Sequence, residues 1–155
     1  TAIRGGLRVD DLIDLDLSYS PPYGQAKDAV NLVGYVGENV LTGTLRLWDA
    51  RELDEVRETA LVLDARSRGE VAEVAIPGAL NIPHTELRDR LDEVREAAAG
   101  RPVRVLCASG VRSHIAHRVL EQAGFDSASL SGGMKTLLAT LGDRARDVLE
   151  FGVAE

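Results

Sequence analysis

The stretch that decides the fold is Val105-Leu106-Cys107-Ala108-Ser109-Gly110-Val111-Arg112-Ser113, in which an apolar strand runs into a short loop and then a helix. The loop holds the only cysteine of the chain. Inward-pointing loop amides, the N-terminus of the helix and the positive charge of Arg112 would all favour the thiolate, which is the nucleophilic form of cysteine. We therefore predict that Cys107 and Arg112 are catalytic.

A cysteine at the end of an inner strand is more often an inert small hydrophobic residue, and that alternative has to be weighed. The spacing C-x-x-G-x-R-S between a strand and a helix favours a reactive thiol over it. Gly110 would supply backbone freedom, and Ser113 is predicted to cap the helix. The predicted substrate-binding residues of this loop are Ala108, Ser109, Gly110, Val111 and Ser113.

From Thr44 onward, short apolar stretches alternate with amphipathic ones, which predicts an α/β fold. A short parallel sheet of about five strands would carry helices on both of its faces. Strands are predicted near Leu45 and Leu47 and over residues 60–63, 80–82, 103–106 and 128–130. Helices are predicted over residues 50–58, 85–99, 112–123, 134–141 and 144–151, with a shorter one after a Ser67–Glu70 capping box. Ligands of such folds bind at the carboxyl ends of the strands, where Cys107 lies.

Three further segments accompany the cysteine loop: Leu61-Val62-Leu63-Asp64-Ala65-Arg66, Ile76-Pro77-Gly78-Ala79-Leu80-Asn81-Ile82-Pro83 and Leu130-Ser131-Gly132-Gly133-Met134-Lys135. In this order, over about residues 44–142, they resemble the rhodanese domain, a sulfurtransferase module. The resemblance implies a rhodanese-like fold and a persulfide on Cys107. One departure is Val74-Ala75, where the family often has Gly-His, a histidine that is neither nucleophile nor base there.

Residues 1–43 do not have the pattern of a domain and are predicted to form an N-terminal arm with one helix. Asp28 can cap that helix, in which Val30, Val33, Val36 or Gly37, and Val40 fall on one face. The segment 16–31 resembles the C-terminal end of the dimerisation domain in FAD-dependent pyridine nucleotide-disulfide oxidoreductases. The coenzyme A-disulfide reductase and NADH oxidase-like branch, in which a tyrosine matching Tyr19 lies near the partner's reductase site, is the best match.

This second resemblance divides the chain into residues 1–43, a flavoprotein tail, and residues 44–155, a rhodanese domain. It implies a longer, homodimeric parent that uses FAD, NAD(P)H and coenzyme A, with its own reductase domain as a partner of this chain. No G-x-G-x-x-G follows a strand here, so we expect no cofactor in this fragment. The chain begins at Thr1 and its only methionine is Met134, which also favours a fragment.

The composition of the 155 residues argues against some classes of binding partner. A net charge of −7 argues against nucleic acid and against an anionic membrane surface. No apolar stretch has the length of a membrane span. A single cysteine excludes an internal disulfide framework and fits a reducing compartment, so we expect a cytoplasmic protein.

The rhodanese resemblance implies a simple mechanism. The Cys107 thiolate attacks the outer sulfur of thiosulfate, a polysulfide or a persulfide, and the leaving group departs as a stable anion. An acceptor thiol or cyanide then removes the sulfur from the persulfide. Arg112 and the amides of residues 108–113 would stabilise the negative charge. Arg66, at the end of a strand, is expected at the pocket mouth as a substrate-binding residue, with an ordinary surface role as the alternative.

Two other functions stay open. A cysteine-based phosphatase or arsenate reductase would use the same thiolate and arginine, but it typically spaces them C-x-x-x-x-x-R, one residue wider than here. It would also need an acid, and the sequence places neither Asp64 nor Asp126 there. The other alternative is a non-catalytic binding or regulatory module, although inactive rhodanese-like domains usually lack the cysteine. His114 and His117 could ligate a metal, but no other ligands accompany them, so we interpret them as surface residues and expect no metal.

Overall fold

The computed structural model describes residues 2–17, 22 and 28–152, and the chain forms two compact units, residues 1–45 and 46–155. The first unit contains helix α1 (Ala2–Gly5), a 3-10 helix η1 (Asp10–Leu12) and helix α2 (Ala29–Leu41). Tyr19 and most of the segment that resembles the flavoprotein tail lie outside the described residues.

Helix α2 is the predicted N-terminal helix, and it is joined closely to the segment before it. The side-chain amide of Asn31 donates to the carbonyl oxygens of Leu12 and Ile13 at 3.0 and 3.1 Å. A Cβ at Gly34 would lie 2.8 Å from the Ile13 nitrogen, so only glycine permits this approach. Asp28 precedes the helix as predicted, but its side chain makes no capping hydrogen bond.

The second unit alternates strands and helices as the sequence predicts. Its elements are β1 (Leu47–Trp48), η2 (Ala50–Glu52), α3 (Leu53–Thr59), β2 (Leu61–Asp64), α4 (Arg68–Glu73), β3 (Val74–Ala75), β4 (Leu80–Asn81), η3 (Leu87–Arg90), α5 (Leu91–Ala98), β5 (Val103–Leu106), α6 (Val111–Gln122), β6 (Ser127–Leu130), α7 (Gly133–Leu141), η4 (Gly142–Arg144), α8 (Ala145–Val148) and β7 (Glu150–Phe151). Five strands form a parallel sheet in the order β1-β6-β5-β2-β4. The predicted fold class is therefore confirmed.

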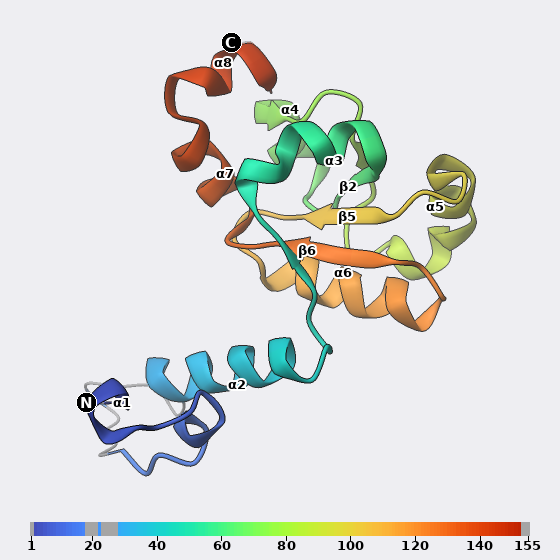
Figure 1. Cartoon of the computed structure of the whole chain (residues 1–155). Helices are drawn as coiled ribbons and strands as arrows, with labels where there is room; N and C mark the ends of the chain where they lie inside the picture. Colours follow the sequence, from blue (N-terminus) through green and yellow to red (C-terminus); the bar gives the residue numbers. More distant parts are fainter. Residues whose placement is uncertain (1, 18–21, 23–27, 153–155) are drawn as a thin grey trace. The chain divides into compact units, whose positions relative to one another are not determined.

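Helices cover both faces of this sheet, with α3 and α6 on opposite sides in Figure 1. Because successive strand residues point to opposite faces, the strands divide their apolar side chains between two cores. One core, with α5 and α6, contains the strand residues Leu61, Leu63, Val103 and Val105. The other, with α3 and α7, contains Val62, Leu106, Ala128 and Leu130. Burial on both faces explains why the central strands are continuous apolar runs.

The sheet order brings three strand ends together at one edge. Strand β5 is central, and its parallel register aligns Leu106 with Asp64 of β2 and Val105 with Ser129 of β6. Cys107 follows β5 directly, so it leaves the middle of the sheet at its carboxyl edge. The expected position of the cysteine loop is confirmed.

The end of the chain differs from the prediction of one helix over residues 144–151. Helix α8 spans only four residues, and β7 then pairs antiparallel with β3, aligning Phe151 with Val74. The backbone N–H of Gly152 donates to the carbonyl oxygen of Glu73 at 3.0 Å, which extends this pairing. The helix prediction was wrong here because the partner strand lies far away in sequence. No helix in the described part of the chain is long and apolar enough to cross a membrane.

Candidate functional site

Cys107 lies where β5 ends, at the start of the loop that leads into α6. Its side chain is almost fully buried, with 1% of the residue exposed. Gly110 has a φ of 111°, a left-handed conformation that side chains other than glycine rarely adopt. The glycine therefore lets the loop turn back toward the sulfur before the helix begins, as the sequence predicts.

The first turn of α7 fixes the other side of the loop. The backbone N–H groups of Met134 and Lys135 donate to the carbonyl oxygens of Cys107 and Ala108 at 2.8 and 3.1 Å. A Cβ on Gly133 would lie 2.5 Å from the Cys107 carbonyl oxygen, so this contact needs glycine. The Gly-Gly segment of the sequence thus holds the cysteine loop in place.

Cys107 Sγ takes part in two hydrogen bonds, one as acceptor and one as donor. The backbone N–H of Gly110 donates to Sγ at 3.2 Å, and the thiol donates to Ser113 Oγ at 3.4 Å. Burial raises the pKa of the Cys107 thiol, but hydrogen bonds from the Ser113 side chain and from the backbone at Ser113, Ser109 and Gly110 outweigh it, so the pKa is lowered overall. A thiol with a lowered pKa is a better source of thiolate at neutral pH.

Ser113 does not cap the helix as predicted. Helix α6 begins at Val111 after the N-cap residue Gly110, which places Ser113 in the first turn. The hydroxyl of Ser113 donates to the Gly110 carbonyl oxygen at 3.1 Å and accepts from Ser129 Oγ at 2.8 Å. Ser129 is a buried residue of β6 that the sequence did not single out. Only the pairing of β5 with β6 brings its hydroxyl to the loop.

The positively charged side chain of Arg112 forms an ion pair with a carboxylate. Its guanidinium makes a two-pronged ion pair with Glu70 of α4, with N–O distances of 2.6 and 2.7 Å. This pair lowers the pKa of Glu70 to about 2 against the cost of burial, and Ser67 also donates to the carboxylate. The expected Ser67–Glu70 capping box is present. The sequence identified Glu70 as a helix cap but not as the partner of Arg112, 42 residues away.

Arg66, expected to bind substrate at the pocket mouth, lies instead inside the fold. It is 3% exposed, and its guanidinium makes a two-pronged pair with the buried carboxylate of Asp64 at distances down to 2.6 Å. Its Nη1 and Nη2 also donate to the carbonyl oxygens of Glu70 and Val74. Arg66 therefore has a structural role instead of the expected substrate-binding one, because these bonds hold its guanidinium inside the protein.

The other loop residues differ in exposure. Val111 and Ser109 are exposed, whereas Ala108 and Gly110 are half-buried. Substrate binding by Ala108, Ser109, Gly110, Val111 and Ser113 stays a prediction, as do the catalytic roles of Cys107 and Arg112.

His117 is not a surface residue, contrary to the expectation. It is fully buried, its Nε2 accepts from the backbone N–H of Arg46 at 3.2 Å, and its Nδ1 lies 2.6 Å from Ser127 Oγ. An accepting Nε2 means a neutral ring, and burial accordingly lowers the pKa of His117. His114, one turn earlier, is half-buried. Across the described ranges, no group of three His, Cys, Asp or Glu side chains could hold a metal ion.

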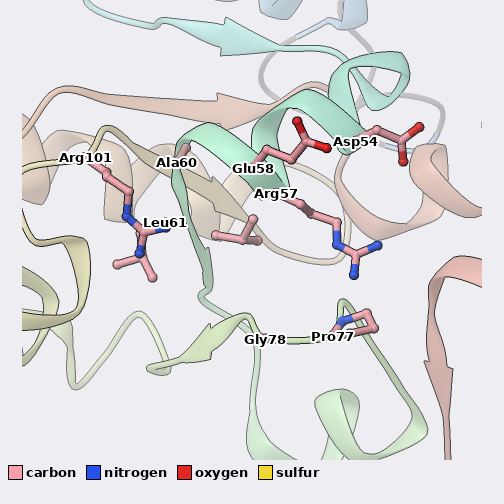
Figure 2. A pocket seen from close by; sticks show the side chains of 9 residues that line it. Asp54, Arg57, Glu58, Ala60, Leu61, Pro77, Gly78 and Arg101 are labelled. Carbon is pink, nitrogen blue, oxygen red and sulfur yellow. The ribbon is translucent and has the colours of Figure 1, made fainter.

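A surface pocket of about 480 Å³ lies away from the cysteine loop (Figure 2). Its walls come from α3, the beginning of β2 and the turn at Pro77 and Gly78, with Arg101 at one side. Ala60 and Leu61 stand at the amino end of β2, whereas Cys107 follows the carboxyl end of the neighbouring strand. Cys107 is not among the residues that line this pocket, so the pocket takes no part in the chemistry of the cysteine loop.

The loop is suited to hold a negatively charged sulfur. The backbone N–H of Gly110 donates to the buried sulfur, the thiol donates to Ser113 Oγ, and the guanidinium of Arg112 is already paired with Glu70. Hydrogen-bond dipoles therefore provide the immediate stabilisation of a sulfur anion at Cys107, whereas the charge of Arg112 is shared with Glu70.

Comparisons with known proteins show the family of the chain. A family model described as "Rhodanese-like domain" matches residues 46–140. The chain is 38% identical to the reduced CoADR-RHD of Bacillus anthracis, with a TM-score of 0.85. This match covers 92% of this chain and 25% of that one. It is also 38% identical to a NAD-dependent persulfide reductase from A. fulgidus, with a TM-score of 0.73, covering 87% and 24%.

A rhodanese-related protein from Thermoplasma volcanium is 29% identical, with a TM-score of 0.57, and the match covers 61% of this chain and 92% of that one. None of the curated proteins compared with the chain matches it. The chain thus spans about a quarter of the length of the first two structures.

Proposed function

Because this chain belongs to the rhodanese-like domain family, we propose that it is a sulfurtransferase domain that carries sulfur as a persulfide on Cys107. The observation that supports the proposal most directly is the environment of Sγ. The Gly110 amide donates to the sulfur at 3.2 Å, and hydrogen bonds lower the pKa of the thiol despite its burial. A structural cysteine in an apolar core would instead have a raised pKa.

The proposed reaction has two displacements on sulfur. The Cys107 thiolate attacks the outer sulfur of a donor, and the sulfur–sulfur bond of the donor breaks with its electron pair on the leaving group. Thiosulfate would release sulfite, and a polysulfide or persulfide would release a shorter polysulfide or a thiolate. An acceptor thiolate or cyanide then attacks the outer sulfur of the persulfide and returns the Cys107 thiolate. No net oxidant or proton donor is required, because each leaving group is a stable anion.

The loop amides have the same task in both steps, which is to stabilise negative charge on sulfur. They are fixed before reaction by Gly110 and by the contacts to α7, so little reorganisation is needed when charge develops. Arg112 would contribute at longer range, since its guanidinium is paired with Glu70. The substrates that fit are small sulfur-donor anions and acceptor thiols.

We further propose that the chain is the C-terminal part of a longer, homodimeric FAD- and NAD(P)H-dependent reductase that acts on coenzyme A disulfide, polysulfide or coenzyme A persulfide. The 38% identity to the B. anthracis and A. fulgidus structures supports this, since the match covers a quarter of each. In that setting, Cys107 would hand its sulfur to the reductase domain. NADH-dependent sulfide release by the longer protein should then be lost in a Cys107→Ser variant.

The direct test uses the chain as it stands. We would incubate it with thiosulfate, and separately with polysulfide, and measure the intact mass. A gain of one sulfur atom that cyanide removes, and that Cys107→Ser does not show, would support the proposal and identify the better donor. No sulfur adduct from either donor would refute a self-sufficient sulfurtransferase and favour a non-catalytic module.

The phosphatase alternative is tested in the same samples with an aryl phosphate substrate. Four residues separate Cys107 from Arg112, and the guanidinium that should bind phosphate is already held by Glu70. We therefore expect no phosphate release above that of Cys107→Ser.

A further inference from the structure

Ser129 is a buried residue whose hydroxyl is hydrogen-bonded to the helix that follows the cysteine loop. It belongs to β6, is 1% exposed, and its Oγ donates to Ser113 Oγ at 2.8 Å. Ser113 in turn lies 3.4 Å from Cys107 Sγ. Three buried side chains from a strand, a helix and a loop thus form one line of hydrogen bonds that ends on the sulfur.

The directions of these bonds show what each hydroxyl does while Cys107 is a thiol. Ser113 Oγ accepts from Cys107 and from Ser129, and its own proton goes to the Gly110 carbonyl oxygen at 3.1 Å. A hydroxyl has one proton and two lone pairs, so Ser113 is fully used. Its oxygen is held in place from behind by the Ser129 donor.

Loss of the thiol proton changes this balance. The thiolate can no longer donate, and the proton of Ser113 is the hydroxyl proton within reach of Sγ. That proton must then turn from the Gly110 carbonyl oxygen toward the sulfur. A hydroxyl that accepts a hydrogen bond is a stronger donor, because the bonds in a chain polarise one another. Ser129 therefore strengthens the bond that the thiolate receives.

We propose that Ser129 is a positioning residue for Cys107, acting through Ser113 to favour the thiolate over the thiol. The inference deepens the proposed function, since a larger thiolate fraction would speed sulfur transfer, but it concerns ionisation alone and can be tested without any sulfur donor.

Four charged groups around the loop form two ion pairs. Asp64, at the end of β2, is bound by Arg66. Arg112 of α6 is bound by Glu70 of α4, and its electrostatic partners include both Cys107 and Asp64. His114 is half-buried on α6, with its pKa lowered by burial, and Lys135 is exposed on α7. Among the described residues, none of these charged groups is hydrogen-bonded to Ser129, so removal of its hydroxyl leaves their charges in place.

The chain offers a matched control in Ser127. It lies on the same face of β6, two residues earlier, and is equally buried. Its hydroxyl is bonded to His117 rather than to Ser113, with the His117 Nδ1 at 2.6 Å. Ser127→Ala removes one buried hydroxyl and leaves a buried histidine short of a partner, so it should loosen the fold at least as much as Ser129→Ala.

The experiment measures the rate of Cys107 alkylation by iodoacetamide against pH, and the single cysteine makes the signal unambiguous. The polarising effect of Ser129 contributes only part of the strength of one charge-assisted hydrogen bond. At pH values below the thiol pKa, we therefore expect Ser129→Ala to react about two- to threefold more slowly than the unmodified chain. The plateau at high pH should not change. Ser129→Thr, which keeps the hydroxyl, and Ser127→Ala should retain the profile of the unmodified chain.

The double variant Ser113→Ala/Ser129→Ala tests whether the effect passes through Ser113. Its alkylation profile should match that of Ser113→Ala, because Ser129 no longer acts on the sulfur once the Ser113 hydroxyl is removed. A Ser129→Ala profile equal to the unmodified chain, an equal shift in Ser127→Ala, or additive effects in the double variant would each overturn the proposal. If neither sulfur donor forms an adduct while Ser129→Ala still shifts the profile, the sulfurtransferase function fails and this inference stands.

Discussion

Glu70→Gln removes the charge that holds Arg112 while it leaves most of the local structure in place. The glutamine carbonyl can still accept from the Ser67 backbone N–H, as the carboxylate does at 3.1 Å. The helix cap of α4 is therefore retained in the variant, and the change isolates the ion pair. We expect a loss of unfolding free energy at neutral pH and a rise in the reactivity of Cys107.

The magnitude follows from the pKa of Glu70, which falls from its ordinary value of 4.5 to about 2 in the folded chain. A shift of this size corresponds to about 3 kcal/mol when fully realised. Roughly a third of the Glu70 and Arg112 side chains is exposed, with fractions of 33% and 29%, and solvent screens such a pair. We therefore expect about 1–2 kcal/mol at pH 7.

The sign of the pH dependence is fixed by the lowered pKa. The contribution of Glu70 is complete above the unfolded value of 4.5 and is lost as the pH falls toward the folded value of about 2. Urea unfolding at pH 7, 5, 4 and 3 should therefore give curves for the unmodified chain and Glu70→Gln that differ at neutral pH and converge in acid. Cys107 should also be alkylated faster below its thiol pKa, because Arg112 loses its counter-charge.

Glu52→Gln is the matched control for this experiment. Glu52 closes the other capping box of the fold, accepting from the Asp49 backbone N–H at 2.6 Å, and no arginine is paired with it in the described residues. It should lose less stability than Glu70→Gln and leave alkylation unchanged. A stability difference between Glu70→Gln and the unmodified chain that is absent, or that stays constant from pH 7 to 3, would refute the reasoning.

Two further predictions concern the support of the loop and a buried base. Gly133→Ala should lower stability by about 2 kcal/mol or more and slow alkylation of Cys107, because its Cβ would lie 2.5 Å from the Cys107 carbonyl oxygen at a φ of 62°. Gly124→Ala has a positive φ but no atom within 4 Å of its Cβ, so it should lose less; equal losses in urea unfolding would contradict the packing argument. Burial lowers the pKa of His117, so stability should fall as the pH drops below the unfolded value of 6.5. His117→Gln should flatten the dependence of unfolding free energy between pH 8 and 5.5, and an unchanged slope would exclude His117 as its source.

The alternation of strands and helices could be predicted from the sequence because it depends on local patterns. A buried strand shows as an apolar run and a helix as a 3.6-residue period, so β2, β5, β6 and α6 lie near their expected positions. Strand β7 could not be found this way. Its two residues, Glu150 and Phe151, are extended because they pair with β3, and a stretch that short has no period of its own.

The candidate site divides in the same way. The position of Cys107 and the conformation of Gly110 follow from neighbouring residues, so the sequence was sufficient for both. The hydroxyl of Ser129 and the carboxylate of Glu70 reach the loop only through the sheet order and the placement of α4. No spacing in the sequence marks such contacts, because they depend on which elements become neighbours in the fold.

The paired arginine changes how the thiolate has to be understood. From the sequence, the positive charge of Arg112 is expected to favour the thiolate of Cys107 together with the loop amides and the N-terminus of the helix. In the fold, Glu70 cancels most of that charge at 2.6 Å. The pKa of Cys107 is nevertheless lowered, and the groups that lower it are the Ser113 hydroxyl and the loop amides. Of the groups expected from the sequence, the hydrogen-bond donors at fixed positions thus contribute more than the paired cation, and a site of this kind depends more on the geometry of its loop than on its net charge.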